Sequence, residues 1–480
     1  MSNLPAELLE IIFLSYFYRA PSPLWYSMPI ATRRPPTSPA AHETFACRRA
    51  CLMLVSRRWY DVICRAQTLW QDIEVTPVTT THTLEAAMSH SGLRPLHVSC
   101  IFSAVYRSTY ALNPLPLSVA EQVEVVSQAF TTLLPSATRW DSLSVIAEDY
   151  QVIDACLLLI DRPARPQVLA QATIIFSGAN PHPRSPSLAS QTSFPPPALL
   201  PKDPSLRKHG MRSLTSLTLR RCAVAWDSLR DVFSAALEDL NIDTPRDPVA
   251  VEVLVSLLSK SPGLQHLRLG GYFIRLPDPV LGEDASLDMS VHLPSLRHAF
   301  LSEMSSQTIV VLMRIIEAPN LCQFSLDLRR YARNPVDVAG FQDVLPHLLH
   351  GTSFASASSL RHLHLRRLDL RPSLVYDGVN QLYAPFISLT HLTLDFRTLQ
   401  IEYWMWLLEC SADGALPRLA HLSIAGLSPL EVQELICIRA DANLPRVNLH
   451  MLVFFTMYDS PLYLHWLQRH TLSFTVAREF

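Results

Sequence analysis

The sequence predicts an α/β protein in which a small N-terminal helical domain precedes a solenoid of repeated helix–strand units. Two observations lead to this fold class. Over residues 1–75, apolar residues recur three or four positions apart, which is the spacing of amphipathic helices. After residue 80, helical stretches alternate with short strands of the form L-x-x-L-x-L. Because one such unit cannot cover its own apolar face, stacked units would form a parallel sheet, with strands on a concave face and helices outside.

The N-terminal domain is predicted to hold three short helical pieces. Asn3 can cap the first helix, and Pro5 suits a first turn, where a missing N–H costs little. An apolar stripe follows in this helix, formed by Leu8, Ile11 and Ile12. A second helix is predicted over residues 47–63, with a stripe of Leu52, Val55, Trp59, Val62 and Ile63, and a third piece begins at Leu69 and Trp70. Helices this short cannot bury so much apolar surface among themselves, so part of it must face something else.

These residues, taken in order, resemble the F-box, a module that docks on the small Skp-family adaptor of cullin-based ubiquitin ligases. The matching segments are LPxELLxxIF at 4–13, LVSRRWYDVI at 54–63 and LWxxI at 69–73. The proline-rich spacer at about 18–44 is longer than in the family, and we interpret it as a looped insertion. The alternative is an ordinary helical cap on the repeats. The resemblance implies an adaptor-binding surface made of Leu4, Pro5, Leu8, Ile12, Phe13, Val55, Trp59, Leu69 and Trp70.

The repeated units resemble leucine-rich repeats, which are known to follow F-boxes. Nine L-x-x-L-x-L strands are predicted between residues 210 and 450, and helices are expected at 153–160, 251–258, 309–316, 341–348 and 401–408. The leucine-rich-repeat consensus places Asn or Cys eight residues after the first Leu; only Cys222 fits, so an irregular array is expected. The predicted organisation is a helical domain at 1–75, first units at 80–177, a flexible Pro/Ser-rich loop at 178–209, the main array at 210–450 and a C-terminal cap at 451–480.

A register of histidines stands out in the main array. Strand alternation directs the residue before the second leucine onto the open face of the sheet. At the ends of the array this residue is Ser216, Asp239 or Arg446. In five of the nine late units it is histidine. We interpret the face as a candidate target-binding surface, whose charge would rise below about pH 6.5. Its residues are His266, Arg268, His298, His362, His364, His391 and His421.

Two other interpretations of the histidines were considered. Each histidine can simply be tolerated on a half-exposed strand. Alternatively, imidazoles bind zinc, but a nearly flat ladder has poor tetrahedral geometry, so no metal is expected. Cys47 and Cys51 lack a second Cys or His pair at zinc spacing and are interpreted as ordinary thiols.

Composition narrows the function classes. With 49% hydrophobic and 17% charged residues, the chain is rich in core-forming residues rather than disordered. A net charge of −2 gives no excess of positive charge that would indicate binding to nucleic acid or to an anionic membrane. No apolar run approaches the roughly 18 residues of a membrane span. Nine scattered cysteines indicate reduced thiols, hence a cytoplasmic or nuclear location. The motifs G-x-S-x-G, G-x-G-x-x-G, H-E-x-x-H and the phosphate loop are absent, so neither an enzyme nor a cofactor is expected.

The resemblance to the F-box and to leucine-rich repeats implies a substrate-recognition subunit of an SCF-type cullin ubiquitin ligase. The F-box would bind the Skp-family adaptor and so the cullin complex, and the repeat array would hold an unknown target protein. Its contribution would be proximity, since it raises the effective concentration of target lysines. One alternative is a non-catalytic leucine-rich-repeat-like binding scaffold with no ligase role. The other is an enzyme on an unfamiliar α/β frame, which requires a convergence of acid, base and nucleophile that this strand face does not offer.

Overall fold

The computed structural model divides into two compact units, Met1–Ser234 and Ala235–Phe480, and the predicted α/β class with parallel strands is confirmed. Each unit is described by itself. The described residues are 4–19, 45–103, 117–160, 169–178, 214–222, 226–243, 249–271, 274–275, 289–304, 306–327, 359–366, 386–395, 402–454 and 461–479. The predicted insertion near 18–44, the loop at 178–209 and the helix at 341–348 lie largely or wholly outside these residues.

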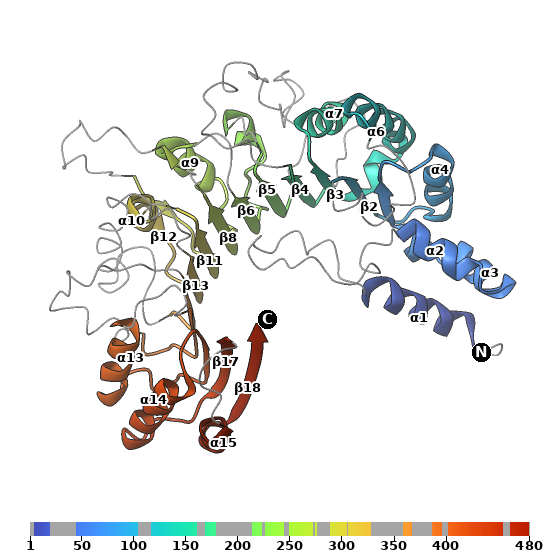
Figure 1. The fold of residues 1–480 in the computed structure, drawn as a ribbon. Coiled ribbons are helices and arrows are strands. Elements are labelled where there is room, and N and C mark those ends of the chain that lie inside the picture. Colours follow the sequence, from blue (N-terminus) through green and yellow to red (C-terminus); the bar gives the residue numbers. More distant parts are fainter. Residues whose placement is uncertain are drawn as a thin grey trace. The chain divides into compact units, whose positions relative to one another are not determined.

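The first unit begins with helices and continues as a parallel sheet. Its N-terminal elements are α1 (Ala6–Arg19), α2 (Phe45–Met53), α3 (Arg57–Arg65), the 3-10 helix η4 (Gln67–Trp70) and β1 (Asp72–Val75). Then follow α4 (Thr81–His90), β2 (Leu96–Phe102), α6 (Val119–Leu133), η5 (Leu134–Arg139), β3 (Trp140–Ala147), α7 (Tyr150–Ile160), β4 (Gln171–Phe176), β5 (Ser216–Arg220) and η6 (Trp226–Asp231). The strands pair in the order β1-β2-β3-β4-β5. Figure 1 shows α4, α6 and α7 along one side of them.

The second unit repeats the same plan. Its main strands, all parallel and in this order, are β6 (Asp239–Asp243), β8 (His266–Gly270), β11 (His298–Ser302), β13 (Gln323–Asp327), β14 (His362–Arg366), β15 (His391–Asp395), β16 (His421–Ala425), β17 (Asn448–Phe454) and β18 (Ser473–Glu479). Its helices include α9 (Val251–Leu258), α10 (Ser306–Ile315), α13 (Glu402–Ala412), α14 (Pro429–Asp441) and α15 (Pro461–His470). Two short parallel pairs complete it, β7 (Val249–Ala250) with β9 (Ile274–Arg275) and β10 (Val291–His292) with β12 (Ile316–Glu317). In Figure 1, α9, α10, α13 and α14 follow one side of the strands.

The repeated leucines explain why these strands stack. From β6 to β17 the second and third apolar positions of each main strand point toward the helices and are buried, for example Leu363 and Leu365 in β14 and Leu392 and Leu394 in β15, all at most 2% exposed. Helix starts are fixed locally. The Ser428 hydroxyl accepts the Glu431 N–H at 3.3 Å, while the Glu431 carboxylate accepts the Ser428 N–H at 2.7 Å, which forms a capping box on α14. Local caps and shared apolar burial thus define each helix–strand unit.

The predicted strand register was wrong by two residues in two repeats, at β17 and at β2. In β17 Asn448, not Arg446, pairs with His421 of β16. In β2 Val98 pairs with Leu143 of β3, and Leu93 is 92% exposed instead of being a core leucine. The physical reason is that apolar residues alternate beyond the predicted strands, so two frames satisfy the pattern equally well.

Two predicted domain edges also differ from the structure. The helical domain at 1–75 ends in β1, which pairs with β2 and is therefore the first strand of the sheet. The segment 451–480, expected as a separate cap, contains α15 and β18. Because β18 pairs in parallel with β17, this segment adds one more helix–strand unit to the sheet.

Candidate docking helices and strand face

Helix α1 is apolar on two faces, and only one of them is buried. Leu9 and Phe13 are 1% exposed, and the Phe13 ring packs on Trp59 of α3 with ring centroids 4.8 Å apart. Exposed apolar residues extend from beside this buried face around the helix; we call Leu8, Ile11, Ile12 and Tyr16 the α1 stripe. The sequence predicted Leu8, Ile11 and Ile12 as one apolar stripe; the structure shows that this stripe faces away from the core of the described residues.

Further contacts hold α1 against α3 and η4. Glu10 accepts a hydrogen bond from the Thr68 hydroxyl at 2.7 Å, and Arg58 donates to the backbone carbonyl of Leu4. One of these contacts is made just before α1 begins and the other within its first half. These contacts fix the orientation of α1, so the α1 stripe stays exposed.

The predicted second helix is two helices. The chain leaves helical geometry at residues 54–56, and Ser56 caps α3 by accepting the Trp59 N–H at 3.2 Å. The break leaves Leu54 and Val55 exposed at the junction, at 86% and 58%. The single helix predicted over residues 47–63 was therefore wrong, because a serine cap outcompetes continuation of the helix here.

The nine residues predicted to bind the adaptor do not share one environment. Pro5, Leu8, Ile12 and Val55 are exposed, and Leu4 and Trp59 are half-buried. The other three, Phe13, Leu69 and Trp70, belong to the core of the first unit and are only 1%, 3% and 6% exposed. The Trp70 indole N–H donates to the Ile63 carbonyl at 2.7 Å, and its ring stacks on His90. Their assignment as direct partner contacts was wrong, because the chain itself satisfies and covers them.

A buried charged cluster that was not predicted from the sequence connects α2 to β1. Arg49 donates to the carbonyl of Leu69 at 2.9 Å, and its guanidinium lies 4.7 Å from the Trp70 ring centroid. Burial lowers the pKa of Arg49 to about 10, against the opposing effect of Glu74 and Asp72. Burial likewise raises the pKa of Glu74 to about 7, although the carboxylate accepts the Phe45 N–H at 2.7 Å. The cluster fastens α2 to η4 and β1.

The outward residues of β6–β18 form the strand face of the second unit, opposite the helices. Its first row contains the register predicted from the sequence, and the five histidines do occupy equivalent positions. In strand order the row is Asp239, His266, His298, Gln323, His362, His391, His421, Asn448 and Ser473. The second row is Asn241, Arg268, Phe300, Ser325, His364, Thr393, Ser423, His450 and Thr475.

The histidines of the first row contact one another in two groups. His362 stacks on His391 and His391 on His421, with ring centroids 4.0 and 4.2 Å apart and planes within 7°. In the other group, His266 pairs with Asp239 and stacks on His298, whose Nδ1 lies 2.9 Å from the Gln323 amide oxygen. Parallel strands bring equivalent side chains this close, so the stacks follow directly from the register.

The surroundings of three face histidines correct the expectation that the charge of the face rises below about pH 6.5. Burial, followed by neighbouring His298, His421 and Arg361, lowers the pKa of His362, and burial with the flanking histidines lowers the pKa of His391. Burial and then Arg366 lower the pKa of His364 to about 4, against the attraction of Asp395. The face therefore does not gain these charges at the ordinary pH of a histidine. It remains neutral at these positions until more acidic conditions.

His364 gives a direct test through stability. Its pKa is depressed in the folded state, so the unfolded chain binds more protons between about pH 6.5 and 4, and stability falls as pH drops through this window. Replacing His364 with Asn should reduce the loss of unfolding free energy between pH 7 and 5 by about 2 kcal/mol, as measured by urea unfolding at both pH values. The exposed His82→Gln control should leave the pH dependence unchanged. An H364N variant with the wild-type pH dependence would contradict the assignment.

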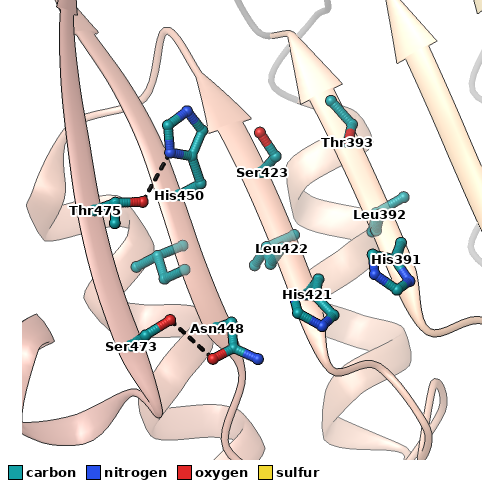
Figure 2. A pocket seen from close by; sticks show the side chains of 11 residues that line it. His391, Leu392, Thr393, His421, Leu422, Ser423, Asn448, His450, Ser473 and Thr475 are labelled. Atoms are coloured by element: carbon teal, nitrogen blue, oxygen red, sulfur yellow. Dashed lines mark hydrogen bonds between the residues drawn. The ribbon is translucent and has the colours of Figure 1, made fainter. Parts of the chain in front are cut away.

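The strand face is hollowed at two places. One hollow of about 300 Å³ lies over β15–β18, and its polar lining comes from His391, Thr393, His421, Ser423, Asn448, His450, Ser473 and Thr475. Figure 2 shows His391 and His421 side by side, with the hydrogen bonds from His450 to Thr475 and between Ser473 and Asn448. A second hollow of about 200 Å³ lies over β6–β13, where the Arg268 guanidinium lies 4.3 Å from the Phe300 ring centroid.

The first unit has a polar pair of its own on the outward side of β2 and β3. His97, missed by the sequence frame, pairs with Ser142, and its Nδ1 lies 3.0 Å from the Ser142 hydroxyl and 3.7 Å from Asp141. The two-residue shift of the frame is why His97 was not recognised as a face residue.

Within the described residues, no three His, Cys, Asp or Glu side chains are grouped as metal ligands. No helix in the same part of the chain is long and apolar enough to cross a membrane. A scan against protein-family models found no family that matches this sequence, and a search of curated proteins found no significant match.

Proposed function

We propose that the chain is a non-catalytic recognition subunit of an SCF-type cullin ubiquitin ligase. Its N-terminal helices dock on a Skp-family adaptor, and its strand face holds a target protein near the ubiquitin-charged enzyme. The α1 stripe carries this proposal, since it leaves large apolar side chains exposed on a helix that already has a buried face formed by Leu9 and Phe13. Clustered exposed apolar side chains of this kind mark protein–protein interaction sites.

The burial pattern argues against a simple helical cap. A cap would bury its apolar stripe against the first repeat unit, whereas Leu8 and Ile12 are 45% and 47% exposed. Leu9 and Phe13 already form the buried face that packs α1 against the rest of the unit. The exposed residues Leu54 and Val55 supply a second apolar element at the junction of α2 and α3. Helix α1 therefore has one face that stabilises the unit and one that is available to a partner.

The test measures the affinity of the purified chain for a purified Skp-family adaptor by isothermal titration calorimetry. A Leu8→Ala/Ile12→Ala variant should lose about thirtyfold in affinity, since two half-exposed side chains that become buried contribute about 2 kcal/mol together. Stability should change little, because neither side chain packs in the core. Circular dichroism checks that the variant remains folded.

Leu93→Ala is the matched control, because Leu93 is an exposed leucine before β2 and outside the docking helices. It should bind the adaptor as wild type does. An absence of binding by the folded wild-type chain would overturn the ligase role and leave a repeat scaffold that acts through its strand face alone. Equal losses in the α1 variant and in L93A would show that the α1 stripe is not the docking site.

A further inference from the structure

The part of the strand face over β14–β18 has an unusual composition. Its ten first-row and second-row positions hold five histidines, with Asn, Ser and Thr at the others, and these described positions include no Asp, Glu, Lys or Arg. The other end of the face differs, since Asp239 pairs with His266 and Arg268 lies over Phe300. The β14–β18 end therefore gains positive charge on protonation with no carboxylate in its own two rows to neutralise it.

The geometry of the stack limits how it can take up protons. Rings 4.0 and 4.2 Å apart place neighbouring imidazoles in direct contact, so a charge on His391 repels a charge on His362 or His421. A bound anion relieves this repulsion, because it accepts hydrogen bonds from the ring N–H groups and favours their charged form. The hollow beside His391 and His421 adds hydroxyl donors from Thr393 and Ser423.

The same residues indicate which anion fits. Phosphate groups in proteins and nucleic acids are typically held by Arg or Lys, and the two rows over β14–β18 contain neither. A carboxylate carries a single charge and accepts hydrogen bonds from imidazole and hydroxyl groups without needing a guanidinium. The hollow extends across four neighbouring strands and is not enclosed, so it suits side chains from an extended segment rather than an enclosed small molecule.

We infer that the hollow over β15–β18, with the His362–His391–His421 stack at its edge, binds an Asp/Glu-rich peptide segment and takes up protons as it does so. This rests on the proposed target-holding function and names the chemical class of the target segment. Binding strengthens as pH falls from about 7.5 to 5.5, because the stack is largely neutral at the upper value and each carboxylate stabilises a protonated ring.

Charged and titratable neighbours of the stack are few. From β14 the groups facing His391 are His362, His364, Arg361 and Arg366, and Asp395 lies at the end of its own strand. Asp327, Arg366 and Asp395 are adjacent in register across β13–β15, one row beyond Ser325, His364 and Thr393, and together they carry one net negative charge. From β16 and β17 the facing groups are His421 and His450. The titration of the stack thus depends mainly on its own histidines and on what binds them.

The experiment measures fluorescence anisotropy of a labelled octaglutamate peptide with the full chain at pH 7.5, 6.5 and 5.5 in low salt. Octaglutamine and a peptide of alternating phosphoserine and glycine are the comparison probes. Octaglutamate should bind at least tenfold more tightly at pH 5.5 than at 7.5, and octaglutamine should not bind. His391→Gln/His421→Gln should abolish most of this gain, and the single variant of exposed His421 serves if the double variant does not fold.

His266→Gln/His298→Gln is the matched control, because it removes two face histidines and the same potential charge from the other group. It should keep the pH-dependent binding. Equal loss in both double variants would overturn the inference, since net charge rather than the stack would then explain binding. Tighter binding of the phosphoserine peptide, or octaglutamate affinity that does not change with pH, would also overturn it. Adaptor affinity is measured separately, so failure here is distinguishable from failure of the ligase role.

Discussion

Replacement of Arg49 with alanine is expected to destabilise the first unit by about 3 kcal/mol or more. The guanidinium donates to the carbonyls of Leu69 and Asp72, at 2.9 and 3.3 Å, and it is 4% exposed. Its removal leaves a buried carbonyl without this donor and removes the positive charge that opposes the high pKa of Glu74. Breaking a buried charged contact costs far more than its net contribution, because the remaining groups stay desolvated.

Urea unfolding followed by circular dichroism measures this change. The exposed Arg57→Ala at the start of α3 is the matched control and should lie within about 0.5 kcal/mol of wild type. A loss below 1 kcal/mol in R49A would show that the Arg49 cluster does not fasten α2 to β1. The variant also separates stability from docking, because Arg49 lies in the interior and is not one of the exposed residues proposed to meet the adaptor.

The strand register of the second unit was predictable because two independent patterns agree. Leucines at fixed spacing set which residues face the helices, and the alternation of strands then sets which face outward. His362, His391 and His421 consequently fall in one row, as the parallel pairing confirms. What the sequence could not supply was the spacing of the rings and the burial that lowers the pKa of His362 and His391, since both depend on neighbours from other strands.

The N-terminal helices were harder to predict for the opposite reason. Leu8, Leu9, Ile11, Ile12 and Phe13 surround much of α1, so periodicity cannot say which side packs inward. The choice is made by partners distant in the sequence, such as Trp59, which meets Phe13. The buried Arg49 was equally hard to predict, because a charged side chain is expected to be exposed unless the carbonyl and the aromatic ring that surround it are known.

Replacement of Leu422 with alanine is the second large effect expected, about 3 kcal/mol from the second unit. Leu422 is 1% exposed and pairs in register with Leu392 and Leu449. Truncation leaves a cavity between the sheet and its helices, which the neighbouring strands can fill only in part. Leu462→Ala, at a leucine 78% exposed on α15, is the control and should change the unfolding free energy by less than about 0.5 kcal/mol.

Hydrogen exchange locates the effect of Leu422→Ala. In a repeat array each unit is stabilised mainly by its nearest neighbours, so amides of β15–β17 should exchange faster, while those of β2 and β3 in the other unit should not change. The same strands carry His391, His421 and His450. Because the hollow depends on rigid strand spacing, octaglutamate binding at pH 5.5 should weaken in L422A although no face residue is altered. Uniformly faster exchange over both units would instead indicate that the array unfolds as a whole.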